Sequence, residues 1–598
     1  MKKKSFLSFL LILSMCLSLT AQVIYVDVSN TTGIEDGTTA HPFNTIKEGI
    51  NAASAGNTVM IKQGTYVPDE SWSGNNHTLF LKAGVKLIGE SRDNTIIAGI
   101  VVDQQSSNLS IGLEKLKFDE FHFIRPTHTG PFTDLNTILH CSTTLISLGF
   151  GAGIPVNDTT PGSNNGFRVE DNNLGTDGII EFKQGAGASE LKVLGNKCGY
   201  IYLKSGGGYK YTIDNNDVRY GLFDNSAANK TTISNNRVFN GTISDLSGGN
   251  QHGIQDEFIE NNTITANENS PAFINEDYKA GIIVKSRSAT VRNNVITCSG
   301  HVSGIRSSAG APLHIINNTI TLDEVQASDT DPYEGTSGIF NYSGWGYVNG
   351  NRIHGGNMGY YSKAATVECA DNVIQNSYTG FSSMGAEVVH HNTITNCKGD
   401  GMILDGLKGP IYSNAIKNNS GSGIRILRVP IDLGGGKDNC PGLNEITGNG
   451  NYDLYIEKTN TQYPVLYARY NVWDHTDTLD IMQYDIRDGN DSTGLVRVDF
   501  TPAGYLGIEN AVSITQPEIS PNPFSQSTSI KWVLAKRSFV SLKILDLTGK
   551  VIKILVNVQL DPGEYHLIFD ACSLPAGVYL CRLQANGTVE TRKVLVCR

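Results

Sequence analysis

The 598-residue chain is poor in charge and rich in glycine, and these proportions exclude several classes of protein. Charged residues make up 18% of the sequence and hydrophobic residues 39%, and 64 residues are glycine. Apolar residues are spread along the whole chain, which excludes extended disorder, and the length predicts two or more domains or a repeat array. The formal net charge of -11, without any run rich in lysine and arginine, argues against nucleic acid as a partner.

The first 22 residues have the pattern of a secretory signal peptide. Three lysines at positions 2–4 precede an apolar stretch from Phe6 to Leu19, and Ala21 supplies a small residue suited to cleavage. The stretch is shorter than the roughly 18 residues of a membrane-spanning helix. We therefore expect residues 1–22 to be removed, and the mature chain to be exported and soluble, with no transmembrane segment.

The cysteines give no sign of a zinc site. Ten are present, one of them in the predicted signal peptide, and they stand far apart without a C-x-x-C pair. We expect most of them to be buried as small apolar residues.

A short sequence motif centred on asparagine recurs along the chain, and the spacing of its copies predicts a solenoid. Successive copies are 20 to 33 residues apart, so one coil needs about 20 residues and the excess forms loops. Apolar residues three before and two after each asparagine are expected to stack into internal columns, and the asparagine amides are expected to bond from coil to coil. The aligned residues are Asn173, Asn196, Asn216, Asn236, Asn262, Asn294, Asn318, Asn351, Asn372, Asn392, Asn414, Asn444 and Asn471.

A second series begins each time with a glycine, which we expect to allow a backbone bend before a strand. In six of the seven copies the next aligned asparagine follows 12 to 14 residues later. The residue after the glycine is apolar and is expected to face inward, whereas the residues two and four after it should face outward. The series comprises Gly281, Gly304, Gly338, Gly359, Gly380, Gly401 and Gly423.

These repeats resemble the right-handed parallel β-helix of pectate-lyase-like proteins, over residues 23–505. Residues 24–100 resemble the opening of that superfamily, with a short amphipathic helix from about Thr45 that caps the solenoid. Residues 425–505 resemble its closing section, and their aspartates are candidate calcium ligands, although their spacing fits no calcium-loop template. These aspartates are Asp485, Asp488, Asp491 and Asp499.

Residues 513–598 alternate strand-length apolar runs with glycine and proline turns, which predicts a small antiparallel β-sandwich. Four motifs resemble the type IX secretion C-terminal sorting domain: PNPF at 521–524, DLTGK at 546–550, LPAGVY at 574–579 and KVLV at 593–596. The resemblance implies a linker at 506–516 and a sorting domain at 517–598. It also implies recognition by the type IX secretion machinery, and a mature protein that is secreted or stays at the outer-membrane cell surface.

The outward positions of the glycine series carry cations and aromatic rings, which suit an acidic polysaccharide laid along the coils. Related polysaccharide lyases use calcium with a lysine or arginine base, so the resemblance implies Lys285, Arg306 and Lys363 as catalytic candidates. The chain contains no family catalytic motif that matches them residue by residue. The expected substrate-binding residues are Tyr342, Tyr361, Asp405 and Arg425.

The two longest insertions follow Asn262 and Asn318 and are acidic. Such loops suit calcium, or a carboxylate pair for glycoside hydrolysis. The histidines show no metal spacing such as H-E-x-x-H, and His390 and His391 are interpreted as residues of the coil surface. The metal candidates are Glu276, Asp277, Asp329 and Asp331.

Two functions follow as expectations. The first is a secreted or cell-surface β-helix that binds polysaccharide, with cleavage by a polysaccharide lyase or glycoside hydrolase mechanism left open. The second is a non-enzymatic adhesin or structural stalk, in which the coils only supply length.

Overall fold

The computed structural model describes residues 21–597 with short gaps, and the chain divides into two units, Met1–Gly504 and Tyr505–Arg598. Residues 1–20 of the predicted signal peptide and the whole predicted linker at 506–516 lie outside the described residues. The gaps are 105–108, 126–134, 151–165, 184–187, 205–207, 227, 246–255, 274–277, 286–287, 309–311, 324–335, 386, 407–408, 429–430, 437–439, 458–464, 493, 505–516, 535–537, 547–548, 561–562, 572–573 and 586–587.

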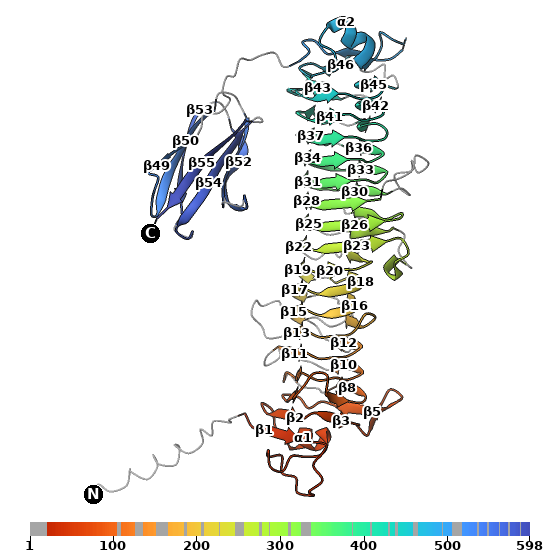
Figure 1. Cartoon of the computed structure of the whole chain (residues 1–598), viewed down its shortest axis with the longest axis vertical. Helices are drawn as coiled ribbons and strands as arrows, with labels where there is room; N and C mark the ends of the chain where they lie inside the picture. Colours follow the sequence, from red (N-terminus) through yellow and green to blue (C-terminus); the bar gives the residue numbers. More distant parts are fainter. Residues whose placement is uncertain are drawn as a thin grey trace, which may run out of the picture. The chain divides into compact units, whose positions relative to one another are not determined.

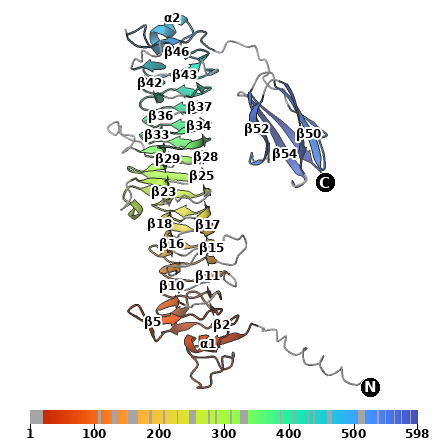
Figure 2. The ribbon, with the colours of Figure 1, turned by 180° about the vertical axis from the view of Figure 1, so that it is seen from behind.

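The first unit is a parallel β-helix, in which each strand pairs with its equivalents in the coils before and after it (Figure 1). A first sheet of 16 strands runs along one side of the stack, and Figure 2 shows the same stack from behind. Its strands in order are β1 (Val23–Val26), β2 (Thr58–Ile61), β6 (Lys86–Gly89), β9 (Gly112–Glu114), β11 (Asn136–Leu139), β13 (Gly166–Glu170), β15 (Ala188–Leu194), β17 (Gly208–Asp214), β19 (Ala228–Ser234), β22 (Asp256–Glu260), β25 (Ser288–Arg292), β28 (Pro312–Ile316), β31 (Trp345–Asn349), β34 (Thr366–Ala370), β37 (Val388–His390) and β40 (Ile411–Tyr412).

Two further rows of strands complete each coil. One row follows the aligned asparagines: β20 (Arg237–Val238), β23 (Thr263–Asn267), β26 (Val295–Ser299), β29 (Thr319–Leu322), β32 (Arg352–His354), β35 (Val373–Gln375), β38 (Thr393–Thr395), β41 (Ala415–Lys417) and β44 (Glu445–Thr447). The other row, here called the glycine-led strands, comprises β5 (Asn75–Phe80), β8 (Ile100–Asp103), β10 (Glu120–Arg125), β12 (Leu145–Phe150), β14 (Ile179–Phe182), β16 (Lys197–Leu203), β18 (Asp217–Asp224), β21 (Thr242–Asp245), β24 (Ala280–Val284), β27 (Ser303–Ser307), β30 (Ser337–Asn341), β33 (Met358–Ser362), β36 (Thr379–Ser383), β39 (Met402–Asp405), β42 (Ile424–Arg428), β45 (Leu454–Ile456) and β47 (Ile486–Arg487).

Short elements close the two ends of the stack. At the N-terminal end, helix α1 (Ile46–Ala52) begins with a Thr45–Glu48 capping box and packs Ile46 and Ile50 into the core, as the sequence predicts. At the C-terminal end lie helix α2 (Thr478–Asp480) and the π-helical turn η2 (Ile481–Asp485). The remaining elements of this unit are β3 (Gly64–Tyr66), β4 (Glu70–Trp72), β7 (Thr95–Ile97), η1 (Pro271–Phe273), β43 (Asp432–Gly434), β46 (Val465–Ala468) and β48 (Arg497–Asp499).

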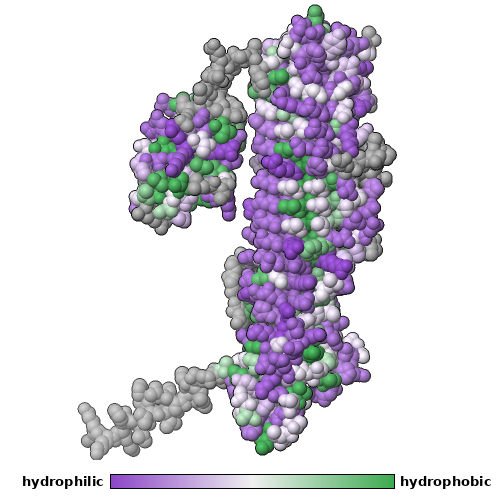
Figure 3. All heavy atoms as spheres, viewed as in Figure 1, coloured by the Kyte–Doolittle hydropathy of each residue, from purple (hydrophilic) through white to green (hydrophobic). Residues whose placement is uncertain are grey.

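The core of the β-helix is one continuous hydrophobic cluster from Ile24 to Phe500. The predicted internal columns are confirmed: the apolar residues three before and two after the asparagines are buried in coil after coil, as at Ile259 and Ile264. The visible surface of this unit is mostly hydrophilic, with hydrophobic residues in a narrow broken strip (Figure 3). Among the described residues, no helix combines the length and apolar character needed to cross a membrane.

A ladder of buried asparagine amides links the coils, as the sequence predicts. Asn294 illustrates the pattern: its Oδ1 accepts from the backbone N and the Nδ2 of Asn262, both at 3.0 Å. Its own Nδ2 donates to the Ile259 carbonyl and to Asn318 Oδ1, both at 2.9 Å. Every ladder amide therefore finds partners away from water, which removes the cost of burying it.

The ladder begins one residue earlier than the sequence alignment suggests. Asn172, not Asn173, donates to Asn196 Oδ1, while Asn173 lies opposite Lys197. The residue before each ladder asparagine has a positive φ, for example 56° at Asn293, and asparagine and aspartate tolerate this conformation. Asp171 takes that place in the first copy, with φ 52°, so the Asn-Asn doublet there is out of phase with the later ones.

The glycine series is required by close packing and not by an unusual backbone conformation. None of its seven residues has a positive φ. A Cβ on Gly359 would lie 2.2 Å from Ile374 Cγ2, and one on Gly380 would lie 2.3 Å from Ile394 Cγ2. The corner of each coil is therefore too close to the next coil for any side chain.

The second unit is the predicted antiparallel β-sandwich, with one sheet of three strands and one of four. Residues such as Ile530, Leu542 and Cys581 form its own buried core. Its strands are β49 (Glu518–Ser520), β50 (Ser527–Leu534), β51 (Ser538–Leu545), β52 (Val551–Leu560), β53 (Gly563–Asp570), β54 (Gly577–Ala585) and β55 (Thr588–Val596).

The described cysteines behave as small apolar residues, as expected. Seven of the eight are buried, Cys597 is exposed, and none of the eight is in a disulfide. Burial raises the pKa of the Cys141 thiol to about 12, so this group stays protonated at neutral pH.

We predict that Asn294→Ala destabilises the β-helix by roughly 2–4 kcal/mol, because it leaves buried donors of the neighbouring coil without an acceptor. Urea denaturation followed by circular dichroism measures the change. The matched control is Asn293→Gly, which alters the exposed positive-φ neighbour and should change the free energy of unfolding by less than about 0.5 kcal/mol. Equal effects of the two variants would contradict a stabilising role of the ladder.

Candidate functional site

The outward side chains of the glycine-led strands form a column that runs along the helix axis. Register places Arg306 opposite Phe340, Phe340 opposite Tyr361, and Tyr361 opposite Ser382. The same column continues through Ile403 to Arg425. Three of the residues predicted to form the site, Arg306, Tyr361 and Arg425, therefore share one column on one face, which we call the glycine-led face.

A second column lies beside it, where the glycine-led strands end. Lys285, Tyr342 and Lys363 each directly follow such a strand. The backbone N of Tyr342 donates to Ser307 O, and that of Lys363 donates to Asn341 O, so these residues occupy equivalent places in successive coils. The remaining cations and the exposed tyrosine of the predicted site are therefore also on the glycine-led face.

Arg306 is held between two aromatic rings. Its guanidinium carbon lies 3.6 Å from the centroid of Tyr278 and 4.0 Å from that of Phe340, and the residue is only 7% exposed. An arginine stays protonated in proteins, so this arrangement favours binding of an anion over transfer of a proton. Phe340 in turn contacts Tyr361, whose ring is buried and supports the site from below.

The next coils repeat the pairing of cation and ring at the surface. Lys363 Nζ lies 5.0 Å from the centroid of Tyr342, which is 40% exposed. Tyr278 is 45% exposed. We call Tyr278, Arg306, Tyr342 and Lys363 the central patch. It combines two exposed aromatic rings with two cations, and these four residues lie within a few coils of one another.

Asp405 and Arg425 are engaged in ion pairs within the protein. Asp405 pairs with Arg428. Arg425 Nη2 lies 2.5 Å from Glu457 Oε2, and its Nη1 lies 3.4 Å from Asp400 Oδ2. A substrate would have to compete with these partners, so the predicted contacts at this end are weaker candidates than the central patch.

The predicted metal ligands cannot be placed. Glu276, Asp277, Asp329 and Asp331 all lie outside the described residues. Their role in binding calcium stays a prediction.

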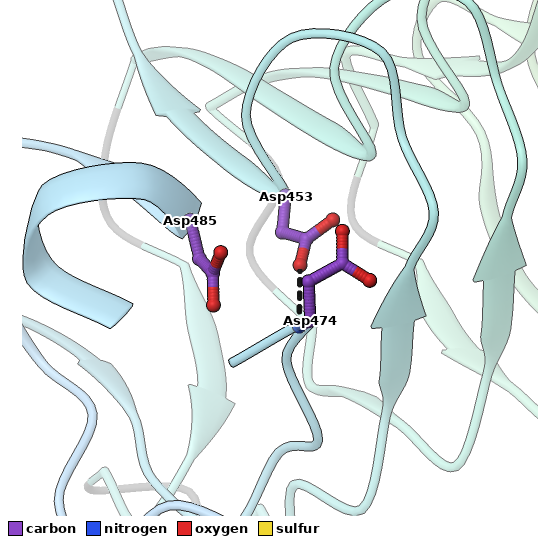
Figure 4. Close-up of side chains that lie close together, drawn as sticks. All are labelled: Asp453, Asp474 and Asp485. Carbon is purple, nitrogen blue, oxygen red and sulfur yellow. Dashed lines mark hydrogen bonds between the residues drawn. The ribbon is translucent and has the colours of Figure 1, made fainter. Parts of the chain in front are cut away.

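A cluster of three carboxylates, which we call the aspartate trio, lies at the C-terminal end of the β-helix (Figure 4). Asp453, Asp474 and Asp485 each bring one carboxylate oxygen within 4.8 Å of the other two. Asp453 and Asp485 are buried and Asp474 is exposed. The sequence pointed to Asp485 alone, because the other two come from separate loops whose proximity has no signature in the spacing.

The trio is anchored by hydrogen bonds. Asp453 Oδ1 accepts from Asn449 Nδ2 at 2.9 Å, and its Oδ2 accepts from the Asp474 backbone N at 3.0 Å. Asp485 Oδ1 lies 2.6 Å from His475 Nδ1. Burial, together with the charges of Asp474 and Asp485, raises the pKa of Asp453 to about 7. Hard oxygen ligands of this kind have the chemistry that calcium requires.

A second aromatic group on the glycine-led face lies outside the predicted row. It comprises Tyr200, Tyr202, Tyr220 and Phe223, in and beside β16 and β18. Gly221 precedes an inward Leu222 and an outward Phe223, as the later glycines do, but register places Tyr200, and not Gly199, opposite Gly221. Extending the glycine series backwards to Gly221 would find Phe223, whereas Tyr200 and Tyr202 do not follow that pattern.

Two adjacent histidines form a further polar cluster, on the first sheet. His390 Nδ1 and His391 Nδ1 are 2.8 Å apart, and His390 Nε2 lies 3.0 Å from Glu368 Oε1. The ring of Tyr412 stacks on His390 with centroids 4.8 Å apart. Burial lowers the pKa of His391, so its imidazole is neutral at pH 7.

Comparison with known families supports both units of the chain. Residues 518–597 match the family described as Secretion system C-terminal sorting domain. Residues 322–465 match Periplasmic copper-binding protein (NosD), and residues 30–113 match Protein of unknown function (DUF1565). The last two are families of right-handed β-helices. A search of curated proteins found no match to the chain.

These matches confirm the predicted architecture and the predicted cellular location. The first unit is a right-handed parallel β-helix, and the second is a type IX secretion sorting domain. The protein is accordingly secreted or located at the cell surface through the type IX machinery.

The trio makes stability depend on pH in a defined direction. The pKa of Asp453 is about 7 in the folded state and its ordinary value is 3.8. The folded state thus holds this proton more tightly, and stability should fall as pH rises from about 4 through 7, by at most about 4 kcal/mol. We predict that Asp453→Asn flattens this profile in urea titrations at pH 5 and pH 8.

Exposed Asp480 in α2 provides the control for this prediction. Asp480→Asn should leave the pH profile close to that of the wild type. If calcium binds the trio, it replaces the proton and should raise the wild-type stability more at pH 8 than at pH 5. An unchanged pH profile in Asp453→Asn would contradict the assignment.

Proposed function

We propose that this exported β-helix binds an acidic polysaccharide through the central patch of the glycine-led face. The observation that carries the proposal is the fixed guanidinium of Arg306 between Tyr278 and Phe340, followed in the next coils by Lys363 over Tyr342. Aromatic faces accept the apolar faces of sugar rings, and the two cations pair with carboxylates.

The geometry of the coils suits a chain that lies along the helix axis. Neighbouring strands are about 4.8 Å apart, which is on the scale of one sugar residue. The column through Arg306 repeats at this interval without a break in register from Ile283 to Arg425. Ile283, Phe340 and Tyr361 in this column are buried. A polysaccharide laid along the face therefore contacts the more exposed groups beside them, Tyr278, Tyr342 and Lys363.

Cleavage of the chain is the finer part of this proposal. Lys285 and Lys363 are the candidate bases, because a lysine amine is a type of group that serves as a general base, whereas an arginine stays protonated. Calcium is the proposed cofactor, and the aspartate trio is the carboxylate cluster among the described residues that has the ligand chemistry for it. Release of unsaturated or reducing ends from uronate polysaccharides, with and without calcium, tests this part separately from binding.

For the binding proposal we predict that Tyr342→Ala and Lys363→Ala each weaken binding of an acidic polysaccharide by roughly tenfold, because each removes half of an exposed cation–ring pair. Affinity electrophoresis in gels that contain polygalacturonate or alginate measures the change. The controls are Trp345→Ala and Tyr347→Ala, which remove rings that are 56% and 46% exposed on the first sheet.

The control variants distinguish polysaccharide binding at the glycine-led face from nonspecific binding over the whole surface. Binding that falls equally in the control variants would contradict the proposal. A wild-type protein that binds no polysaccharide would favour the alternative of a non-enzymatic adhesin or structural stalk.

The histidine cluster favours copper binding as a second candidate function. It lies within residues 322–465, which match a family described as a periplasmic copper-binding protein. Two nitrogen ligands that each lie about 2.0 Å from a metal, with an N–metal–N angle of about 90°, are about 2.8 Å apart. The two Nδ1 atoms of the histidine cluster have this separation. Glu368 would orient His390 as carboxylates commonly orient metal-bound imidazoles.

We predict that the wild-type protein takes up one Cu²⁺ at this cluster and that His391→Ala abolishes this uptake. Electron paramagnetic resonance at pH 7 should show nitrogen ligands to the copper, with weaker binding at pH 5 as the imidazoles become protonated. The control is His354→Ala, an exposed histidine of the same segment. Identical spectra for wild type and His391→Ala would exclude the site.

A further inference from the structure

We infer that the glycine-led face carries a second saccharide anchor in its N-terminal half, and that the two anchors together select long polysaccharide chains. The second anchor, here called the N-terminal platform, is formed by Tyr200, Tyr202, Tyr220 and Phe223. The inference deepens the proposed function and rests on it, because it assumes that the central patch binds an acidic polysaccharide.

The rings of the platform form one aromatic surface. The centroids of Tyr200 and Tyr202 are 5.5 Å apart with planes inclined by 17°, and those of Tyr202 and Phe223 are 5.1 Å apart with planes inclined by 12°. Tyr220 lies 5.1 Å from Tyr200. Near-parallel neighbouring rings offer a broad face, which suits the flat apolar side of a sugar ring.

The platform faces outward, away from the core. Ile201 and Leu222, which alternate with its residues along the strands, belong to the hydrophobic core, whereas no platform residue does. The three tyrosines are partly exposed, and Phe223, which is 7% exposed, packs against Tyr200 and Tyr202. Register runs from Tyr202 through Phe223 and the buried residues Ser244 and Ile283 to Arg306, so both anchors contribute to one column. A ligand that reaches both anchors passes over the two buried residues.

The fold does not require aromatic residues at these positions. The same column holds serine at Ser147, Ser244 and Ser382, and the coils stack there with the same register. The burial of Phe223 is explained by packing, but three partly exposed tyrosines clustered on an outer face that accepts serine elsewhere need another reason. Contact with a ligand provides that reason.

The platform also shares its charge chemistry with the central patch. Lys204 Nζ lies 4.7 Å from the centroid of Tyr202, and the Arg219 guanidinium carbon lies 5.0 Å from that of Tyr220. Both cations are exposed at the edge of the rings. The platform is therefore suited to the same class of ligand, a sugar chain that carries carboxylates.

The distance between the anchors implies selection by length. Two coils, with Ser244 and Ile283 in the column, separate Phe223 from Arg306, so three intervals of about 4.8 Å give about 14 Å. With one sugar per coil, a chain needs about seven sugars to reach from the coil of Tyr202 to the coil of Lys363. Shorter chains engage one anchor, whereas longer chains engage both and gain from the high effective concentration of the second contact.

A series of oligogalacturonates of increasing length tests the inference by isothermal titration calorimetry on the mature protein. Wild type should bind an octamer at least about tenfold more tightly than a trimer. Tyr202→Ser introduces the residue found elsewhere in the column. This variant should abolish the step, meaning the gain in affinity from trimer to octamer, while its affinity for the trimer falls less than about threefold. Tyr347→Ala on the first sheet is the control and should keep the full step.

The possible outcomes separate the two proposals. If trimers bind in a Tyr342-dependent manner but affinity shows no step with length, or if the step survives Tyr202→Ser, the second anchor is refuted and the central patch stands. If no oligomer binds the wild-type protein, and a cooperative thermal unfolding transition shows that this protein is folded, the proposed function fails and the inference fails with it.

Discussion

The hydrogen bond from one asparagine amide to the next is the interaction on which the structure depends. From Asn196 to Asn444, each ladder asparagine receives two bonds from the preceding coil and gives its own amide to the following one, as Asn294 does between Asn262 and Asn318. The backbone hydrogen bonds of a parallel sheet pair neighbouring strands, but by themselves they would also allow a shifted register. A buried polar ladder adds a penalty for any slip in register, since a shifted coil would leave amides unpaired in the core.

This constraint turns an irregular sequence into a regular surface. Repeats differ in length by up to 13 residues, from 20 to 33, yet the outward columns stay in register because the extra residues leave the coil as loops. Side chains as far apart in sequence as Tyr202 and Arg425 therefore lie in one line. Repetition of this kind suits a ligand that is itself repetitive, which is the physical basis for proposing a polysaccharide.

The periodic features of this structure could be predicted from sequence, and the others could not. Internal columns, the asparagine ladder and the sandwich strands follow from spacing, and even the error at Asn173 is a shift of a single residue within a doublet. The aspartate trio has no period, because Asp453, Asp474 and Asp485 meet only through the closure of the last coil. The reason for the glycines was also hidden, since contact of Gly359 with Ile374 depends on the distance between coils.

The ladder has a direction, and this bears on how an exported chain acquires its structure. In every pair the earlier coil supplies both donors and the later coil supplies the acceptor, as with Asn262 and Asn294. The last folded coil of a growing stack therefore presents, at its C-terminal side, the backbone N–H and side-chain amide donors of its asparagine to the next coil. Contacts between neighbouring coils allow folding to propagate from there. A chain that emerges N-terminus first would be able to assemble vectorially, each completed coil serving as the template for the next.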